Sequence, residues 1–344
     1  MSNTRAESSS AAFSATRSNL GIVYVPDTRL YKLAELQPTQ KIVHTTIEFV
    51  DIPGLAKSSA ASSGQQNRFL ADVRNTDALL HVVRCFDDDA LPHIEGRVDP
   101  VRDIETVNLE LQVKDLESVE KKLEKAEKLV RVGDKEAGKL AEVLRVYKKH
   151  LESFMPARTV LLDNNEKQYA GDLFLLSEKP VIYICNVDEA SASEGNEYSR
   201  QVENTLGGEN AEVLTVAAAV EADIAELESE DDRMVFLNDA GLSEPGVNRL
   251  IRSAYRLLDL KTFFTVGPKE VRAWTIKSGM TAPQAAGVIH SDLERGFIRA
   301  EVIKYDDFIE LGSEAACRNK GKLSVEGRNY VVNDGDILNI RFNV

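Results

Sequence analysis

Two short polar motifs follow apolar stretches of this sequence, and both have the residue types of a nucleotide site. The segment IEFVDIPG ends in Asp51 and Gly54, so an Asp-x-x-Gly motif follows a predicted strand. In P-loop NTPases such a motif places a carboxylate near the magnesium ion and a backbone N–H near the terminal phosphate. Asn186, Val187 and Glu189 follow the apolar stretch VIYIC, at the place of the Asn-Lys-x-Asp motif that binds guanine in GTPases.

Glu189 changes the base that this second motif can accept. Its side chain is one methylene longer than the aspartate of GTPases and would crowd the guanine edge, so adenine binding or poor discrimination is expected. Ala218, in the Ala-Ala-Ala run after EVLTV, stands where the base-supporting loop is expected.

The part of the motif set that holds the phosphates is missing upstream. A Gly-x-x-x-x-Gly-Lys-Ser/Thr loop should precede Asp51 by some tens of residues, yet the first glycine is Gly21 and no Gly-Lys pair precedes Asp51. Leu55 stands where many GTPases have the glutamine that orients the attacking water, and an apolar side chain cannot do so. We therefore expect ATP to bind weakly or not at all, because no cationic or N–H cradle is present for the β- and γ-phosphates.

The composition is that of a globular protein with more than one domain. The 344 residues are 43% hydrophobic and 28% charged, and no apolar run approaches the roughly 20 residues that span a membrane. The net charge of −14 is concentrated in residues 161–260, which hold 21 acids and 7 bases. Residues 100–160 and 261–344 are nearly neutral and can approach RNA through local basic patches, although a solvated acidic surface explains the charge equally well.

Strand-like and helix-like segments alternate from residue 19 onwards, which predicts a parallel sheet with helices on its faces. Between residues 107 and 154, apolar residues recur every three or four positions on both sides of a break at Gly133, which predicts an antiparallel coiled-coil hairpin. The alternative interpretation of this hairpin is a simple helical-bundle element that binds no partner. After Leu260, a β-hairpin, a helix over residues 281–294 and the strands AEVIKY, RNYVV and ILNIRF indicate a compact α+β module of ubiquitin-like type.

These segments, above all the last 85 residues, resemble the YchF / Obg-like ATPase family. The block PKEVRAWTIKSGMTAPQAAGVIHSDLERGFIRAEVIKYDDF is similar to that family's TGS domain, and EFVDIPGLAK, HVVRCFDDD, AAAVEADIAEL and DGDILNIRFNV are similar to other parts. The resemblance implies an OBG-type G domain (13–99 and 161–259), a helical hairpin insertion (100–160) and a TGS domain (260–344). Residues 1–12 precede the resemblance, and their small polar composition predicts a disordered N-terminus. It also implies binding of ATP with Mg²⁺ in preference to GTP, ATP hydrolysis, and association with the ribosome, in particular its large subunit, or with RNA.

The resemblance also assigns roles to individual residues. Asn186, Val187, Glu189 and Ala218 would contact the base, while Asp51 and Gly54 would lie at the γ-phosphate and Asp51 near Mg²⁺. Basic residues of the C-terminal module are candidate ribosome or RNA contacts, although solvated surface charge is the simpler reading of each: Lys269, Arg272, Lys277, Arg295 and Arg299.

The sequence departs from the family pattern in the switch regions as well as the P-loop. Ala15 stands where the magnesium-binding threonine belongs, and the Gly-rich loop after Asp51 reads KSSAASSGQQN, with Ser, Ala and Gln in place of several glycines. The first strand of the family's sheet, which lies between the strands IEFVD and HVVRCF, is also missing. Either those two strands pair with each other or the G domain is loose, because unpaired buried backbone groups cost on the order of 1–3 kcal/mol each.

Three interpretations remain open. The first is an ATPase whose gene model is truncated, and the second is a non-catalytic regulator of translation or stress response that binds the ribosome or RNA. The third is a scaffold that keeps the fold without nucleotide. A cytoplasmic location is expected, and a plastid or mitochondrion is left open because the Ser-rich N-terminus contains Arg5 and Arg17.

Overall fold

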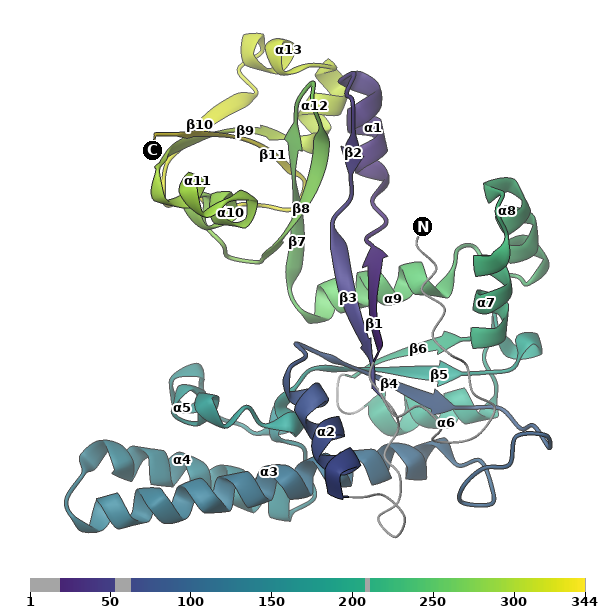
Figure 1. Cartoon of the computed structure of the whole chain (residues 1–344), viewed down its shortest axis with the longest axis vertical. Coiled ribbons are helices and arrows are strands. Elements are labelled where there is room, and N and C mark those ends of the chain that lie inside the picture. Colours follow the sequence, from purple (N-terminus) through teal and green to yellow (C-terminus); the bar gives the residue numbers. More distant parts are fainter. Residues whose placement is uncertain (1–18, 53–62, 208–210, 344) are drawn as a thin grey trace. The chain divides into compact units, whose positions relative to one another are not determined.

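The computed structural model describes residues 19–52, 63–207 and 211–343, with side chains from 63 to 68 left aside. The chain forms two compact units: the first contains residues 1–21 and 50–250, and the second contains residues 22–49 and 251–344 (Figure 1). The chain passes between the units within β1 (Asn19–Tyr24), β3 (Thr46–Asp51) and α9 (Gly246–Leu257). The expected disorder of residues 1–12, and the expectations for Ala15, Gly54 and Leu55, concern residues outside the described ranges.

A three-stranded parallel sheet is the centre of the first unit. Its order is β4-β5-β6, formed by Leu79–Arg84, Val181–Asn186 and Glu212–Val216. The first five residues of β5 are all buried, as is typical of a central strand in a parallel sheet. Alternate side chains of the sheet pack with helices α6 (Glu197–Leu206), α7 (Ala218–Glu226) and α8 (Glu230–Asp239) in one core. The predicted parallel α/β sheet is thus confirmed.

The outer edge of β4 carries no strand among the described residues. β4 pairs with β5 alone, whereas β3 pairs only with β1 in a separate two-stranded sheet. The strands IEFVD and HVVRCF therefore do not pair with each other. Val82, in the middle of β4, is 61% exposed, because it points to the face of the sheet opposite the core that contains Val83 and Cys85.

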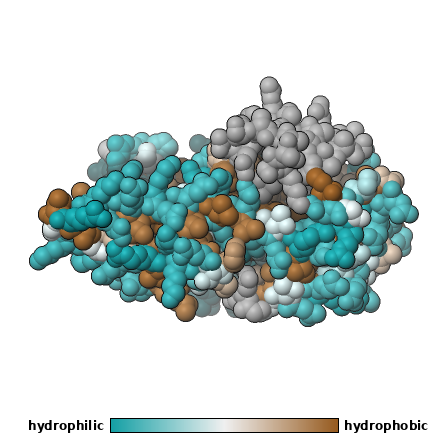
Figure 2. Space-filling view, turned by 90° about the horizontal axis from the view of Figure 1, so that it is seen from below, coloured by the Kyte–Doolittle hydropathy of each residue, from teal (hydrophilic) through white to brown (hydrophobic). Residues whose placement is uncertain are grey.

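Two long antiparallel helices form the predicted hairpin, α3 (Pro100–Arg131) and α4 (Lys135–Glu152). Asp99 and Asp134 cap their N-termini, and Gly133, at φ 92°, makes the turn between them. The buried seam is shorter than the predicted one: Val119 and Ala126 are buried and Leu116 and Leu123 are partly buried in the hairpin core, but the seam positions at its two ends are 40–43% exposed. Apolar patches are accordingly visible among the charged side chains of the hairpin in Figure 2.

A buried carboxylate in α3 adds a polar contact between the hairpin and the segment that leads into β5. Asp115 of α3, 2% exposed, accepts hydrogen bonds from the backbone N–H groups of Leu176 and Ser177, both at 2.7 Å. It also accepts one from the Ser177 hydroxyl at 2.6 Å, and that hydroxyl in turn accepts one from Ala157 N at 3.0 Å. Burial raises the pKa of Asp115, while these hydrogen bonds act in the opposite direction. The smaller helices nearby are α5 (Asn164–Ala170) and α2 (Ser63–Arg74).

The second unit is built on one six-stranded sheet of order β10-β9-β11-β7-β8-β2. Its two faces carry separate cores: one includes Phe263 and helices α10 (Ala282–Ile289) and α11 (Ser291–Arg295), the other Phe264 and helices α1 (Thr28–Leu36), α12 (Tyr305–Leu311) and α13 (Glu314–Asn319). The strands are β2 (Ile42–Val43), β7 (Leu260–Val266), β8 (Val271–Lys277), β9 (Phe297–Lys304), β10 (Leu323–Glu326) and β11 (Asp336–Phe342).

Three details of this unit differ from the sequence-based expectation. The predicted helix over residues 281–294 is broken at His290, whose Nδ1 accepts a hydrogen bond from Asp292 N at 3.1 Å and so caps α11. RNYVV is not a strand: only Val331 forms an isolated bridge, with Thr281, and the strand lies earlier, in β10. Finally, α1 and β2 group with the C-terminal residues, so the compact units divide the chain at other positions than the expected domain boundaries.

Candidate functional site

The carboxyl ends of the three parallel strands bring two of the predicted base-binding residues together. Asn186 is the last residue of β5, and its Oδ1 accepts a hydrogen bond from Ala218 N, the first residue of α7, at 3.0 Å. Parallel strands end at one edge of a sheet, which is where open α/β sheets bind ligands. The contact fixes the loop after β6 against the strand that ends in Asn186.

Val187 and Glu189 face opposite environments. The Val187 side chain is 3% exposed in the core, and its backbone N–H donates to Val216 O at 2.9 Å, so only backbone atoms of Val187 are left near the edge. Glu189 begins a short 3-10 turn and is exposed, while Asp188 accepts from Ser191 N at 3.0 Å and holds this turn. Both carboxylates are exposed at this edge, and Glu189 is the one that does not hold the turn.

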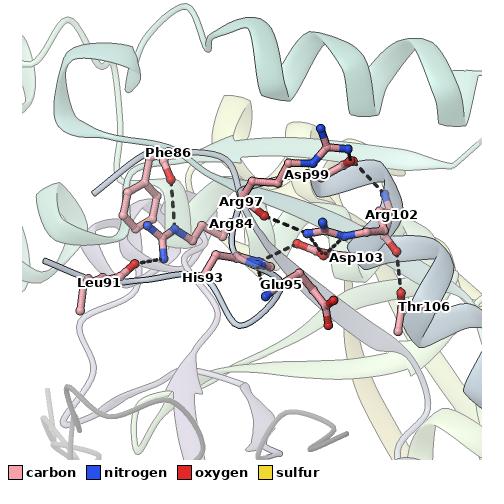
Figure 3. A network of polar contacts seen from close by, with 10 residues as sticks. All are labelled: Arg84, Phe86, Leu91, His93, Glu95, Arg97, Asp99, Arg102, Asp103 and Thr106. Atoms are coloured by element: carbon pink, nitrogen blue, oxygen red, sulfur yellow. Dashed lines mark hydrogen bonds and ion pairs between the residues drawn. The ribbon is translucent and has the colours of Figure 1, made fainter. Parts of the chain in front are cut away.

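A polar network orders the loop that follows β4 (Figure 3). Arg84 Nε donates to Phe86 O at 3.0 Å and its guanidinium lies 4.8 Å from the centre of the Phe86 ring, while Nη1 donates to Leu91 O at 2.6 Å. His93 Nδ1 accepts from Glu95 N at 3.1 Å, so its Nε2 carries the proton that faces Asp103 at 2.9 Å. This network gives the loop a defined shape beside the base-side residues.

The same loop is hydrogen-bonded to the N-terminus of α6. Asn196 Nδ2 donates to Cys85 O at 2.7 Å, and Tyr198 OH donates to Asp87 at 2.9 Å. These residues were not identified from the sequence as site residues. The run HVVRCFDDD was a sequence signal for the loop, but no spacing pattern predicted its contacts with Asn196 and Tyr198.

The part of the site where the nucleotide phosphates would bind offers far fewer polar groups. Asp51 ends β3 and is exposed, and its side chain makes no hydrogen bond with another described residue. Nowhere does the sequence contain Gly-x-x-x-x-Gly-Lys-Ser/Thr; the nearest spacing, from Gly133 to Lys139, has Leu140 at the Ser/Thr position. That segment is the hairpin turn and the first turns of α4, so its N–H groups belong to a helix that follows another helix.

The residues expected to hold Mg²⁺ with ATP do not form a metal site in the described ranges. No group of three or more His, Cys, Asp or Glu side chains with metal-binding geometry occurs there. Asp51 alone cannot replace the hydroxyl and phosphate ligands that a magnesium ion takes in P-loop proteins.

The five basic residues predicted to contact the ribosome do not converge. Lys269 lies in the turn before β8 and Lys277 ends that strand; Arg272 stacks on Trp274 at 3.9 Å; Arg295 pairs with Asp292 in α11. Arg299 is exposed on β9 and lies on the opposite face of the sheet from Arg272. Side chains alternate between the two faces along each strand, and the buried residues next to Arg299 and next to Arg272 belong to different cores. Trp274 packs against Phe263, with the ring centres 6.3 Å apart.

Two arginines that the sequence did not single out lie near Arg299. Arg341 of β11 is the direct cross-strand partner of Arg299, and Arg318 of α13 approaches from the adjacent helix. Both contact Glu301 of β9. They could not be found from local spacing, because these arginines are distant in sequence and only the strand register brings them together.

Among the described residues, no helix has the length and apolar character needed to cross a membrane.

The sequence was compared with known proteins. Residues 260–343 match the family model YchF-GTPase_C, described as a protein of unknown function (DUF933). The chain is 47% identical over 341 residues to the "Ribosome-binding ATPase YchF" of Bacillus subtilis (strain 168), covering 98% of this chain and 93% of that protein. It is 45% identical over 338 residues to the protein of the same name from Escherichia coli O157:H7, with the same coverage.

A solved structure agrees with these sequence relatives. The structure titled "Structure of the Schizosaccharomyces pombe YchF GTPase" superposes with a TM-score of 0.85 at 33% identity, covering 94% of this chain and 87% of that one. The combination of parallel sheet, helical hairpin and C-terminal sheet module is therefore shared with a solved relative. On both the sequence and the structural comparison, this chain belongs to the YchF family.

Proposed function

We propose that this chain is a ribosome-associated member of the YchF family that acts in the cytoplasm and binds ATP weakly or not at all. The observation that carries the proposal is the unequal state of the two sides of its nucleotide site. The base side has Asn186 hydrogen-bonded to Ala218, with Glu189 exposed beside them, whereas the sequence has no Gly-Lys-Ser/Thr loop for the phosphates. The names of the relatives, which are ribosome-binding ATPases, support the ribosome as partner.

The energetic argument is that phosphates contribute binding only where charged or N–H donors receive them. Hydrogen bonds that involve a charged group are worth about 1.5–3 kcal/mol each. Without the lysine and the backbone cradle, the triphosphate stays solvated and the base contacts alone determine affinity. ATP should then bind no more tightly than adenosine.

The expected equality of the affinities for ATP and for adenosine can be tested directly. Calorimetric titration with Mg-ATP and with adenosine should give dissociation constants in the millimolar range that agree within about threefold. A Glu189→Ala variant should weaken both ligands to the same extent, and Glu194→Ala, an exposed residue of the same loop region, should weaken neither. Micromolar affinity for Mg-ATP, at least a hundredfold tighter than adenosine, would refute the proposal.

The proposed association with the ribosome needs a separate measurement. The protein should pellet with ribosomes through a sucrose cushion, and the pelleted fraction should not change when ATP, ADP or a non-hydrolysable analogue is added. Repeating the experiment with separated large and small subunits tests the expected preference for the large subunit. Loss of pelleting at moderate salt for both subunits would contradict ribosome association.

ATP hydrolysis, the activity in the names of the relatives, is the second candidate function. The base-side residues Asn186, Ala218 and Glu189 favour it, but Asp51 is the only candidate magnesium ligand in the described part of the chain. A turnover above that of an Asp51→Ala variant would support hydrolysis.

A further inference from the structure

An apolar groove lies at the base of the helical hairpin, where α3 faces the end of α4. It encloses a hollow of about 200 Å³, and its walls are formed mainly by Leu109, Val113 and Leu116 of α3 and by Leu151 and Phe154 at the end of α4. Leu109 and Val113 are 43% and 42% exposed, and Phe154 is 73% exposed. The three residues of α3 follow the spacing i, i+4, i+7, so they form one apolar stripe along the helix.

Phe154 stands in the wall of this groove with an unfavourable backbone conformation. It occupies the position after the C-cap of α4 in a Schellman motif: its N–H donates to Leu151 O at 3.0 Å, and Met155 N donates to His150 O at 3.3 Å. Its φ of 58° is in the left-handed region, which glycine adopts without strain and phenylalanine does not. Glycine would end the helix equally well, so the helix end does not account for the aromatic ring. Exposed aromatic side chains are typical of protein interfaces.

The charged residues around the groove are predominantly acidic. Side chains three or four positions apart on a helix are neighbours. Every charged residue at that distance from the three stripe residues of α3 is a glutamate: Glu105, Glu110, Glu117 and Glu120. Glu152 of α4 also lines the groove.

Two lysines neutralise only part of this charge. Lys114 pairs with Glu117 at 2.9 Å. Lys148 pairs with Glu120 at 2.6 Å and with Glu152 at 3.7 Å. Five carboxylates against two lysines leave a balance of −3, which repels RNA phosphates and also a second copy of this chain, whose net charge is −14. The surroundings of the groove therefore favour a partner that combines apolar with basic residues.

We propose that the groove binds an amphipathic helix of a partner protein, with a large apolar side chain of that helix in the hollow and lysine or arginine residues beside it. A helix with apolar residues at the same spacing can pack along the stripe of α3. The hollow is smaller than pockets for small molecules, which measure roughly 300–1,000 Å³, but it suits one anchoring side chain. The contact involves neither the nucleotide site nor the ribosome, so it is independent of the function proposed above.

The test uses a fluorescent synthetic peptide of leucine and lysine in the pattern of an amphipathic helix, titrated with the full-length protein and followed by anisotropy. Phe154→Gly should weaken peptide binding at least tenfold, because it removes the anchoring ring. It should not lower the temperature of thermal unfolding, because glycine suits the left-handed conformation. Phe174→Gly is the matched control: Phe174 also has a positive φ, 48°, and is 64% exposed, but it does not line the groove. This control should change binding less than twofold.

A second pair of variants tests the charge. Glu105 and Glu142 are exposed glutamates of the hairpin, and neither forms an ion pair with another residue in the described part of the chain. Glu142 lies in α4 about two and a half turns before Leu151. Glu105→Lys should weaken binding at least threefold and Glu142→Lys less than twofold. A peptide with glutamate in place of every lysine should bind at least tenfold more weakly than the lysine peptide.

The remaining outcomes would overturn the proposal. It is wrong if the wild-type protein binds neither peptide, if both peptides bind equally, or if Phe154→Gly behaves like Phe174→Gly. If sedimentation shows that the wild-type protein dimerises and that Phe154→Gly abolishes the dimer, the groove binds a second copy of this chain and the basic partner is excluded.

Discussion

Replacing Asp115 by alanine should be among the most destabilising single changes in the first unit. The carboxylate is 2% exposed and accepts three hydrogen bonds, from Leu176 N, Ser177 N and Ser177 Oγ. After the substitution the Ser177 hydroxyl can rotate, but the two backbone N–H groups are left in the interior without an acceptor. Each buried unsatisfied donor costs about 1–3 kcal/mol, which gives about 2–6 kcal/mol in total.

A compensating effect reduces this figure. Burial is the largest influence on Asp115 and raises its pKa, so the wild-type protein bears a desolvation cost that the alanine variant no longer has. We therefore expect a loss of about 3–4 kcal/mol in the free energy of unfolding of the unit. Asp115→Asn keeps the shape but turns an NH₂ group towards one donor, so it should lose less than Asp115→Ala and more than 1 kcal/mol.

The matched control is Asp134→Ala. Asp134 also accepts from two backbone N–H groups, those of Glu136 at 3.0 Å and Ala137 at 3.1 Å, but it is an exposed helix cap. Water can replace it, so its loss should cost about 1 kcal/mol.

Hydrogen exchange is the better assay, because a chain of two units need not unfold in one step. A loss of about 3 kcal/mol corresponds to exchange that is roughly a hundredfold faster at the amides of Leu176 and Ser177. Urea unfolding of the whole chain gives the supporting stability measurement. Equal effects of Asp115→Ala and Asp134→Ala, or unchanged exchange at these two amides, would refute the argument that a buried carboxylate stabilises the contact between the hairpin and the segment that leads into β5.

Three further predictions test other parts of the chain. Burial lowers the pKa of His81 to about 4 from its ordinary 6.5, so the unfolded state binds more protons between these values; stability should fall by about 2 kcal/mol from pH 7.5 to pH 5, and His81→Phe should remove that fall in urea titrations. Asp336, 0% exposed, accepts from Lys304 Nζ at 2.6 Å, Tyr330 OH at 2.6 Å and Asn333 N at 2.9 Å, so Asp336→Ala should lower the free energy of unfolding of the second unit by about 3 kcal/mol. Lys304→Met leaves Asp336 its other two donors and should cost less than Asp336→Ala when both variants are unfolded by heat. A Cβ at Gly296 would collide with Asn343 O, so Gly296→Ala should cost about 2 kcal/mol and accelerate exchange at Asn343 N, which donates to Gly296 O at 2.9 Å; normal stability of this variant would contradict the close approach.

Elements with strong periodicity could be predicted from the sequence alone. The parallel strands and the hairpin were found because buried strands and coiled-coil seams repeat their apolar residues regularly. The resemblance to the YchF family is confirmed by relatives that cover 98% of the chain. The break at His290 was missed because apolar spacing continues across it, and only the hydrogen bond to Asp292 N shows that one helix ends and another begins there.

The meeting of site residues could be predicted only where each residue lies in a motif that directly follows a strand of the sheet. Asn186 and Ala218 lie in motifs that follow neighbouring strands, so their meeting followed from parallel pairing. Val187 was predicted at the same edge, but alternation along the chain turns its side chain into the core. The arginine cluster was not foreseen, because the positions of Arg318 and Arg341 relative to β9 depend on sheet register and a helix crossing.

The order in which the second unit is assembled has a consequence for synthesis of the chain. Its first pieces, α1 and β2, leave the ribosome early, yet Ile42 of β2 pairs with Val271, and Leu30 and Leu33 of α1, both 0% exposed, pack on strands made at the very end. A nascent chain must therefore carry these apolar groups without their partners while some two hundred residues are translated. At the elongation rates of cells this waiting period lasts about 10–40 seconds, during which chaperone binding to residues 22–49 should be strongest.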